Sequence, residues 1–275
     1  MASAICIPLQ QHPHFAAALR LLGRDVAMTD ACGAAPVLTI KRFGLKFAPR
    51  GPIWDGATTH DAQTVTLRQL GLGMINSDAT GGPVLRWAGF RQVMTPAHVS
   101  ELCLAGTSDD RLRNAHGKWR NVWRKAQQAP LRISQTVFDP DRHGWLLRAD
   151  LAQQRTKRYR ALPHRIIHAY AAANPRDVIV LVAKQRQATV AAMLFLCHAP
   201  VATYHIGWTN AEGRQHAAHH RLLLHAADTF AASGLLRLDL GTVDTENARG
   251  LARFKIGSGA MTRALGGTWI KIPRL

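Results

Sequence analysis

The stretch GLARFKIGSGA, residues 250–260, places a single lysine among apolar residues and glycines. Lys255 stands between Phe254 and Ile256, and a lysine is rarely buried unless its ammonium has a partner. Glycine lets a backbone turn sharply or approach a ligand closely. Two interpretations follow. Either Lys255 points into a site and meets an anionic group, or a helix ends here at glycine and its last-turn lysine interacts with the helix dipole.

The charge of the chain is its most pronounced global feature. Its 275 residues include 35 Lys and Arg against 17 Asp and Glu, a formal net charge of +18. This balance favours polyanionic partners, namely nucleic acid, an anionic membrane or phosphorylated substrates. The alternative is an arginine-rich genome whose proteins are basic without purpose. With 47% hydrophobic residues the chain can bury a sizeable core, which excludes general disorder.

Several compositional features predict a reduced, cytoplasmic protein. The most apolar run, residues 190–197, has the length of a strand, so we expect no transmembrane segment. Residues 1–15 lack the basic start and apolar core of a secretory signal. No CxxC pair or zinc-type spacing joins the four cysteines, so we expect no metal site; they are Cys6, Cys32, Cys103 and Cys197.

The first half of the chain reads as alternating strands and helices. Residues 36–54 predict paired strands that turn near Gly44, and a helix follows at 62–71. We expect 82–90 to form a strand and 95–106 to form a helix that begins at Thr95-Pro96. In KWRNVWRKAQQ, residues 118–128, the tryptophans follow a helical period and leave a basic face opposite.

The second half repeats this mixture. The expected order is a strand at 131–138, a basic helical region at 145–173 interrupted near Pro163, three antiparallel strands over 177–209, a helix at 213–232, a strand at 235–241, a helix in 250–260, and a strand or hairpin at 261–272. The predicted fold class is therefore α+β. We expect two domains, 1–130 and 131–275, each a mixed, mostly antiparallel sheet flanked by helices.

This order of elements, with the segment 238–260, resembles the FemAB-like branch of the GNAT acyltransferase superfamily. Other matching segments occur in the family's order: FAPRGPIW (47–54) is similar to its PRGP segment, KWRNVWRKA (118–126) to its basic helix, and ATYHIGWT (202–209), DLGTVD (239–244) and LGGTW (265–269) follow. The resemblance covers most of the chain. It implies tandem GNAT-like domains, of which the second carries the FK-x-G-S-G segment.

The resemblance also implies N-acyl transfer to an amine. The donor would be aminoacyl-tRNA, as in FemAB proteins, or acyl-CoA, as in other GNAT proteins, and no tightly bound cofactor is expected. The acceptor would be an amine-bearing small molecule, a peptide or a peptidoglycan precursor. The basic charge favours tRNA as donor. A third possibility is a non-catalytic protein that binds nucleic acid or an anionic membrane.

Catalytic candidates lie near the C-terminus. Lys255 matches the lysine of the family's FK-x-G-F-G-like segment, where an ammonium would neutralise a donor phosphate or developing charge. Ser258 departs from that pattern, because an aromatic residue is common there. Asp239 and Asp244 flank the turn at Gly241, and either would take a proton or orient the amine. The alternative is that they cap a turn or helix, Asp244 capping one from about Asn247.

Candidates for donor binding precede and form the helix at 213–232. Strand alternation places Tyr204 and His205 on opposite faces, so that at most one faces the site; His205 is either a general base or a structural histidine. CoA-using GNAT proteins bind pyrophosphate with a glycine-rich loop. Here alanines and histidines replace close-approach glycines, which weakens the case for CoA. The candidate donor-binding residues are Gly213, Arg214, His216, Tyr204 and Phe254.

The remaining candidates are basic or lie in the PRGP segment. Arg50, with Gly51 and Trp54, would contact the acceptor or its phosphate; the alternative is a proline-built turn with a surface arginine. Candidate phosphate contacts on the basic helix are Arg120, Arg124 and Lys125, which would otherwise form a solvated face. His216 and His220 share a helical face at i, i+4, but without an HExxH pattern they predict no zinc site.

Overall fold

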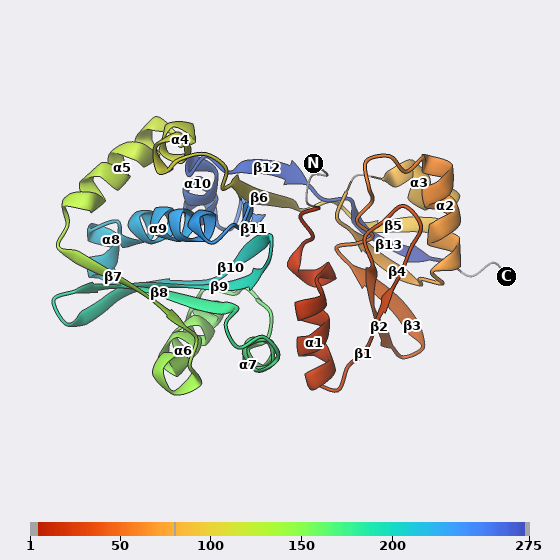
Figure 1. Ribbon diagram of the computed structural model, residues 1–275, viewed down its shortest axis with the longest axis horizontal. Helices are drawn as coiled ribbons and strands as arrows, with labels where there is room; N and C mark the ends of the chain where they lie inside the picture. Colours follow the sequence, from red (N-terminus) through yellow and green to blue (C-terminus); the bar gives the residue numbers. More distant parts are fainter. Residues whose placement is uncertain (1–4, 80, 273–275) are drawn as a thin grey trace. The chain divides into compact units, whose positions relative to one another are not determined.

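The computed structural model describes residues 5–79 and 81–272, and they form two compact units (Figure 1). The first unit takes the chain up to residue 99 and the segment from 263 onward, and the second takes 100–262. The predicted boundary after residue 130 falls inside the second unit. Helices α4 (Ser108–Asn114) and α5 (Gly117–Gln128) belong to the second unit, because Trp119 and Ala115 are part of its core.

The first unit is built on a six-stranded sheet. Its order is β1 (Asp25–Thr29), β2 (Val37–Arg42), β3 (Leu45–Pro49), β4 (Met74–Ser77), β13 (Gly267–Lys271) and β5 (Phe90–Met94). All pairs are antiparallel except β3 with β4. A short 3-10 helix, η1 (Leu9–Gln11), and α1 (Pro13–Leu21) precede the sheet. Helices α2 (His60–Gln69) and α3 (Gly82–Trp87) cover the face that α1 does not (Figure 1).

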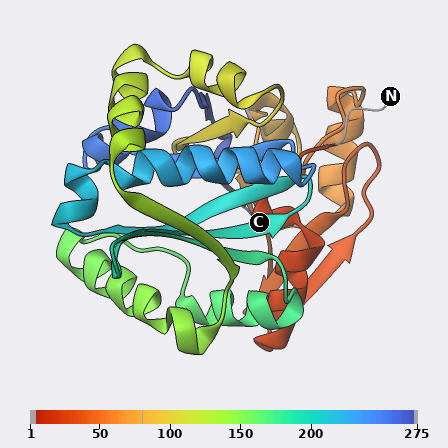
Figure 2. The same ribbon diagram turned by 60° about the vertical axis from the view of Figure 1, so that its left-hand side comes forward.

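The second unit is built on a seven-stranded sheet. Its order is β12 (Met261–Ala264), β6 (His98–Cys103), β11 (Arg237–Val243), β10 (Val201–Thr209), β9 (Ala188–His198), β8 (Val178–Gln185) and β7 (Leu131–Val137). Helix α9 (Ala218–Ala232) lies on one face, and α6 (Pro140–Lys157) and α7 (His164–Ala173) lie on the other (Figure 2). Two further helices, α8 (Ala211–Gln215) and α10 (Arg249–Gly257), flank α9 and β11 in the chain.

Both units thus have the predicted α+β architecture, a mostly antiparallel sheet flanked by helices. The helix around Trp119, the three-strand run β8–β10 and the helix break before α7 are confirmed. The core of the second unit is apolar. Strand β9 is buried from Val190 to Leu196, and α9 packs Leu222, Leu223 and Phe230 against it.

Two predicted elements of the first half were wrong. Residues 82–87 form α3, because Pro83 stands at its first turn and the buried Val84, Leu85 and Ala88 follow a helical period. The predicted helix at 95–106 is instead β6, an inner strand of the second sheet. Thr95-Pro96 therefore precedes a strand.

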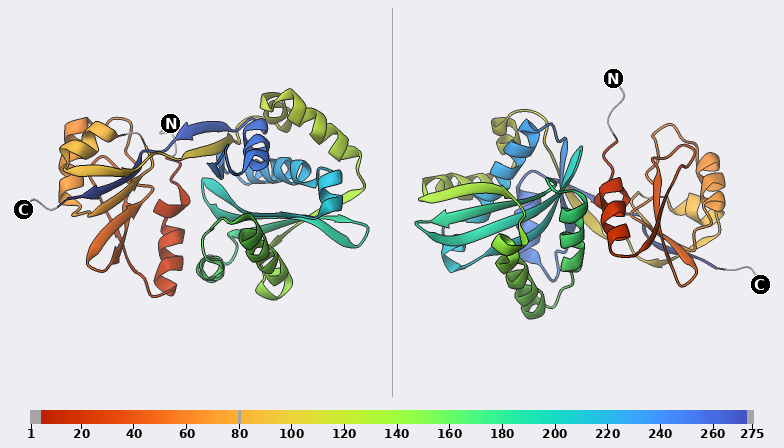
Figure 3. Two further views of the ribbon diagram at one scale, coloured as in Figure 1. Left: turned by 180° about the vertical axis from the view of Figure 1, so that it is seen from behind. Right: turned by 60° about the horizontal axis from the view of Figure 1, so that its bottom comes forward.

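Two C-terminal predictions also need correction. The helix at 213–232 is broken at Ala217, whose φ of 48° separates α8 from α9. The segment 261–272 forms no hairpin, because β12 joins the second sheet and β13 joins the first, where it lies among the orange strands in Figure 3.

Candidate functional site

Lys255 is buried in the last turn of α10, with 5% of its surface exposed. Its Nζ donates a hydrogen bond of 2.8 Å to the backbone oxygen of Thr242, in β11. Burial lowers the pKa of Lys255 to about 8, while the negative charge of Asp239 opposes that shift. Most Lys255 side chains are therefore ammonium at neutral pH, and the proton is held less firmly than in an exposed lysine.

The glycines near Lys255 allow α10 to dock closely on its neighbours. A Cβ on Gly257 would lie 2.9 Å from Cδ1 of Trp119, and one on Gly259 would lie 2.9 Å from the backbone of Asn114. Trp119 Nε1 also donates to the oxygen of Phe254, at 3.1 Å. These glycines serve packing between α10 and the α4–α5 region. Gly250, in contrast, has open space around it.

The two candidate aspartates differ in their surroundings. Asp239 is 2% exposed, and its Oδ1 accepts from the amide of Gly241. Asp244 is exposed and accepts from the amides of Glu246 and Asn247, which lowers its pKa. Asp244 thus caps the turn before α10, a helix that begins at Arg249. Asp239 is the aspartate that interacts electrostatically with Lys255.

Strands β10 and β11 part close to Lys255. Their parallel pairing joins Val201–Thr203 to Arg237–Asp239 and ends there, although both strands continue. Lys255 binds β11 at Thr242, beyond this point of separation. Asp239 is the last paired residue of β11, so the lysine and the aspartate lie where the two strands diverge.

A β-bulge overturns the expected alternation at Tyr204 and His205. Tyr204 pairs with Phe195 and Ile206 with Leu194, which leaves His205 without a cross-strand partner. The charge of Asp150 acts on both Tyr204 and His205. Tyr204 packs against the core cluster, with its ring centroid 5.7 Å from that of Phe195.

Beneath β10, a polar cluster surrounds Asp150. This buried carboxylate accepts from Gln154 Nε2 at 2.6 Å and Tyr159 OH at 3.1 Å, and it pairs with His164 Nε2 at 2.8 Å. None of Asp150, Tyr159 and His164 was predicted from the sequence. They lie within α6, in the following loop and at the start of α7, and these positions form no motif.

His205 is less suited than Lys255 to exchange a proton at neutral pH. Burial lowers the pKa of His205 to about 4, and within the described residues its Nε2 is buried without a hydrogen-bond partner. A general base works best when its pKa lies near the working pH. The arrangement therefore favours Lys255, and His205 fits a neutral imidazole in the wall of the cluster.

In the segment before α9, several backbone amides donate hydrogen bonds within the segment itself. The amide of Gly213 donates to Asn210 Oδ1. The amides of Arg214, His216 and Ala217 donate to the backbone oxygens of Asn210, Glu212 and Arg214, respectively. A Cβ on Gly213 would collide with the backbone of Val190, so this glycine allows α8 to approach β9. His216 ends α8 and His220 lies in α9, so the two histidines do not share one helix face as predicted.

Phe254 lies where α5, α9 and α10 meet. Its ring centroid is 5.2 Å from that of His220 and 6.3 Å from that of Trp119. His219, on the same turn of α9, pairs its Nε2 with the oxygen of Trp208 in β10. This aromatic cluster joins the helix that carries Lys255 to the first turn of α9.

The basic residues of α5 are not equivalent. Arg120 is held by the backbone oxygens of Arg113 and Ala115, so it caps the end of α4. Arg124 and Lys125 are exposed, and Arg124 donates a hydrogen bond of 3.1 Å to Oδ1 of its neighbour Asn121. Contact with phosphate remains a prediction for Arg124 and Lys125.

The PRGP segment lies in the first unit and is stabilised internally. Arg50 is buried, and its Nε donates to Asp78 Oδ1 at 2.8 Å, while Arg263 binds the other carboxylate oxygen at 2.8 Å. A Cβ on Gly51 would meet the Gln11 amide at 2.5 Å. Trp54 packs against the core of this unit. Arg50 is thus no surface arginine, and acceptor binding by this segment remains a prediction.

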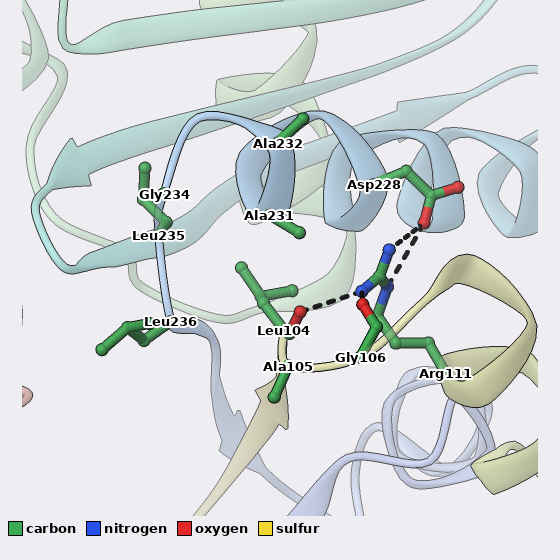
Figure 4. Close-up of a pocket in the computed structure, with 10 residues that line it drawn as sticks. All are labelled: Leu104, Ala105, Gly106, Arg111, Asp228, Ala231, Ala232, Gly234, Leu235 and Leu236. Atoms are coloured by element: carbon green, nitrogen blue, oxygen red, sulfur yellow. Dashed lines mark hydrogen bonds and ion pairs between the residues drawn. The ribbon is translucent and has the colours of Figure 1, made fainter.

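A pocket of about 450 Å³ lies elsewhere in the second unit (Figure 4). Arg111 crosses its wall and donates to Asp228 Oδ1, Leu104 O and Gly106 O. None of the predicted site residues lines it. Across residues 5–79 and 81–272, no cluster of metal-ligating side chains occurs, and no helix has the length and hydropathy to cross a bilayer.

Comparisons with known proteins identify the fold. Neither a family model nor a curated protein sequence matches the chain. The structure of FemX superposes with a TM-score of 0.74 over 98% of this chain and 97% of FemX, at 12% identity.

Two further solved structures share the architecture. L-PGS from Bacillus licheniformis gives a TM-score of 0.55 over 96% of this chain and 93% of its own, at 10% identity. A tandem GNAT protein from the clavulanic acid biosynthesis pathway gives 0.50 over 88% and 80%, at 12% identity. The chain therefore has the FemX-like, tandem GNAT fold that its sequence resemblance predicted.

Proposed function

We propose that this protein transfers an aminoacyl group from aminoacyl-tRNA to an amine, with Lys255 stabilising negative charge in the transition state. The observation that carries the proposal is the buried Lys255 ammonium beside Asp239, where β10 and β11 part. The amine nitrogen forms a bond to the acyl carbon, the ester C–O bond breaks, and the tRNA hydroxyl leaves with the proton that the amine loses. A fixed ammonium there would neutralise the oxyanion or a donor phosphate.

Two observations favour tRNA over CoA as the donor, namely the engaged backbone amides before α9 and the exposed positive charge. The amides before α9 that would cradle a pyrophosphate are already engaged within the protein. Exposed cations lie on two of the helices that meet at Phe254, with Lys118, Arg124 and Lys125 on α5 and Arg249 and Arg253 on α10, and Arg214 is exposed on α8. Such a surface favours a polynucleotide backbone over a single small anion.

Acyl-CoA is the second candidate donor. Helix α9 begins at Ala218, and its N-cap residue Ala217 provides no side-chain cap; an uncapped helix N-terminus attracts phosphate. Under this alternative, CoA would raise the melting temperature of the protein at modest concentration, and aminoacyl-tRNA would not be consumed.

A salt series of tRNA and CoA binding tests the proposal. Replacing Lys118, Arg124 and Lys125 by alanine is expected to reduce the slope of log K against log salt by about two to three for tRNA. The matched control replaces exposed arginines on the opposite face of the same sheet, Arg142, Arg148 and Arg165. Equal slopes in both triple variants, together with saturable CoA binding, would contradict tRNA as the donor.

The acceptor is proposed as an amine on a peptidoglycan precursor or a related peptide. The support is the likeness of the fold to that of FemX and the resemblance of PRGP and FK-x-G-S-G to FemAB segments. Peptide-dependent loss of the aminoacyl ester in the presence of the purified protein is the expected result.

A further inference from the structure

The first unit exposes large apolar side chains at one end. Phe43, in the turn between β2 and β3, is 92% exposed, and Leu21 and Leu45 are 61% and 46% exposed. The register pairs Asp25 with Lys41 and Arg42 with Leu45. It brings the α1–β1 turn to the same end of the unit as the β2–β3 hairpin, as Figures 1 and 3 also show.

The backbone at Phe43 adds a second observation. Phe43 has a φ of 51° and Gly44 a φ of 76°, the left-handed pair of a tight hairpin turn in which Asn-Gly is favoured. A bulky residue is disfavoured in this region. The ring gains no core packing in return, since it is almost fully exposed and contacts the Arg42 guanidinium, 4.9 Å from its centroid. Neither folding nor turn geometry therefore accounts for phenylalanine here.

Charge at this end is strongly one-sided. Asp25 is the acidic residue of segments 20–25 and 41–46, and the cationic residues are Arg20, Arg24, Lys41, Arg42 and Lys46. Lys46 is engaged with the oxygen of Leu70, whereas the other four are exposed. Apolar side chains thus stand among cations.

We propose that this end of the first unit, named here the hairpin patch (residues 20–25 and 41–46), docks on an anionic lipid membrane. Phe43, Leu21 and Leu45 would enter the boundary between headgroups and acyl chains, and the cations would meet lipid phosphates. An RNA ligand fits less well. A base can stack on Phe43, but the two leucines offer no stacking surface. This inference is independent of the proposed catalytic activity, because no residue of the patch belongs to the Lys255 site.

Sedimentation of the full chain with vesicles tests the proposal. We expect binding to phosphatidylcholine vesicles that contain phosphatidylglycerol and little binding to phosphatidylcholine alone. Phe43→Asn suits the left-handed backbone and removes the ring, so the variant is expected to fold normally and to lose about tenfold in vesicle affinity. Replacing Arg42 by glutamine is expected to cost about fivefold, an effect that salt removes.

Met94→Ser is the matched control. Met94 is 63% exposed in β5, at the opposite edge of the same sheet, and its replacement is expected to leave vesicle binding unchanged. Equal vesicle affinity of Phe43→Asn and the native chain would overturn the proposal. Loss of tRNA binding in Phe43→Asn with vesicle binding retained would also overturn it. A change from dimer to monomer in light scattering, with no change in vesicle binding, would do the same.

Discussion

Lys255 carries a charge that its surroundings disfavour. A pKa lowered from 10.5 to about 8 corresponds to a free-energy cost on the order of 3 kcal/mol for holding the ammonium in the folded protein. A lysine retained in the core at such a cost, with one backbone oxygen and one nearby carboxylate to compensate it, is typical of a functional site.

Replacing Lys255 by methionine is expected to leave the protein at least as stable at pH 7. The unfolded lysine binds its proton up to about pH 10.5, whereas the folded one releases it from about pH 8. The unfolded state therefore holds more protons between these values, and this residue makes the free energy of unfolding rise with pH there. Chemical denaturation from pH 7 to 10.5 should show that rise in the native protein and in a Lys184→Met control. A rise of the same size in Lys255→Met would contradict the buried-ammonium interpretation.

Asp78 has a structural role that the sequence did not reveal. It receives Arg50 and Arg263 on separate carboxylate oxygens, and Arg263 also binds its backbone oxygen. Asp78→Asn is expected to destabilise the first unit by about 3 kcal/mol, because it removes the carboxylate charge that faces the buried Arg50 and the half-buried Arg263. Urea unfolding measures this, with the exposed Asp61→Asn as the control. A cost equal to that of Asp61→Asn would show that the ion pairs contribute little.

At the residue scale, sequence motifs singled out some candidate residues and missed others. FK-x-G-S-G predicted Lys255, and the DLG turn predicted Asp239. Asp150 and His164 had no such signal, because α6, a loop and α7 bring them together only in the folded chain. The bulge at His205 was equally hidden, since it becomes visible only in the pairing of β10 with β9.

At the element scale, the docking of α10 depends on Gly257, at the end of the helix, and on Gly259, which follows it. Gly259→Ala is expected to destabilise the protein by roughly 1 kcal/mol or more. The added Cβ would meet the backbone of Asn114, and the φ of this residue is 89°. Gly250→Ala, in open space on the same helix, is expected to stabilise by up to about 1 kcal/mol. Thermal unfolding of the two variants compares them directly, and equal melting temperatures would refute this role of Gly259.

Periodicity predicted long elements well and short ones poorly. In α5, tryptophans at helical spacing decided the assignment, and β8–β10 had long apolar runs. The six residues of α3 are also of strand length, so a short apolar pattern there did not decide between helix and strand, and Pro96 before β6 imitates a helix start. At α8–α9 the break occurs at Ala217, a residue type that gives no sign of a left-handed backbone.

At the scale of the whole molecule, the last strand ties distant segments together. β13 lies inside the first sheet, between β4 and β5, although the chain between β5 and β13 forms the second unit. Truncation after Thr262 is therefore expected to unfold the first unit and leave the second folded. Hydrogen exchange should show fast exchange in β2–β4 and retained protection in β8–β10. Retained protection of β4 would contradict the prediction.

The domain boundary lay beyond the reach of sequence reasoning for the same reason. Composition marks no linker at residue 99 or 263, and only strand pairing decides that β13 belongs with the first unit. Fold class was predictable because each half alternates strands and helices. The assignment of α4 and α5 to the second unit depends on where Trp119 packs, which no local pattern encodes.

The most direct measurement is the rate at which aminoacyl-tRNA loses its ester with a peptidoglycan precursor peptide as acceptor, in parallel with acetyl-CoA consumption. We predict that the native protein and Lys184→Met consume aminoacyl-tRNA, that Lys255→Met is slower by about 100-fold or more, and that acetyl-CoA is untouched. Unchanged turnover in Lys255→Met, or consumption of acetyl-CoA in place of aminoacyl-tRNA, would contradict the proposed reaction.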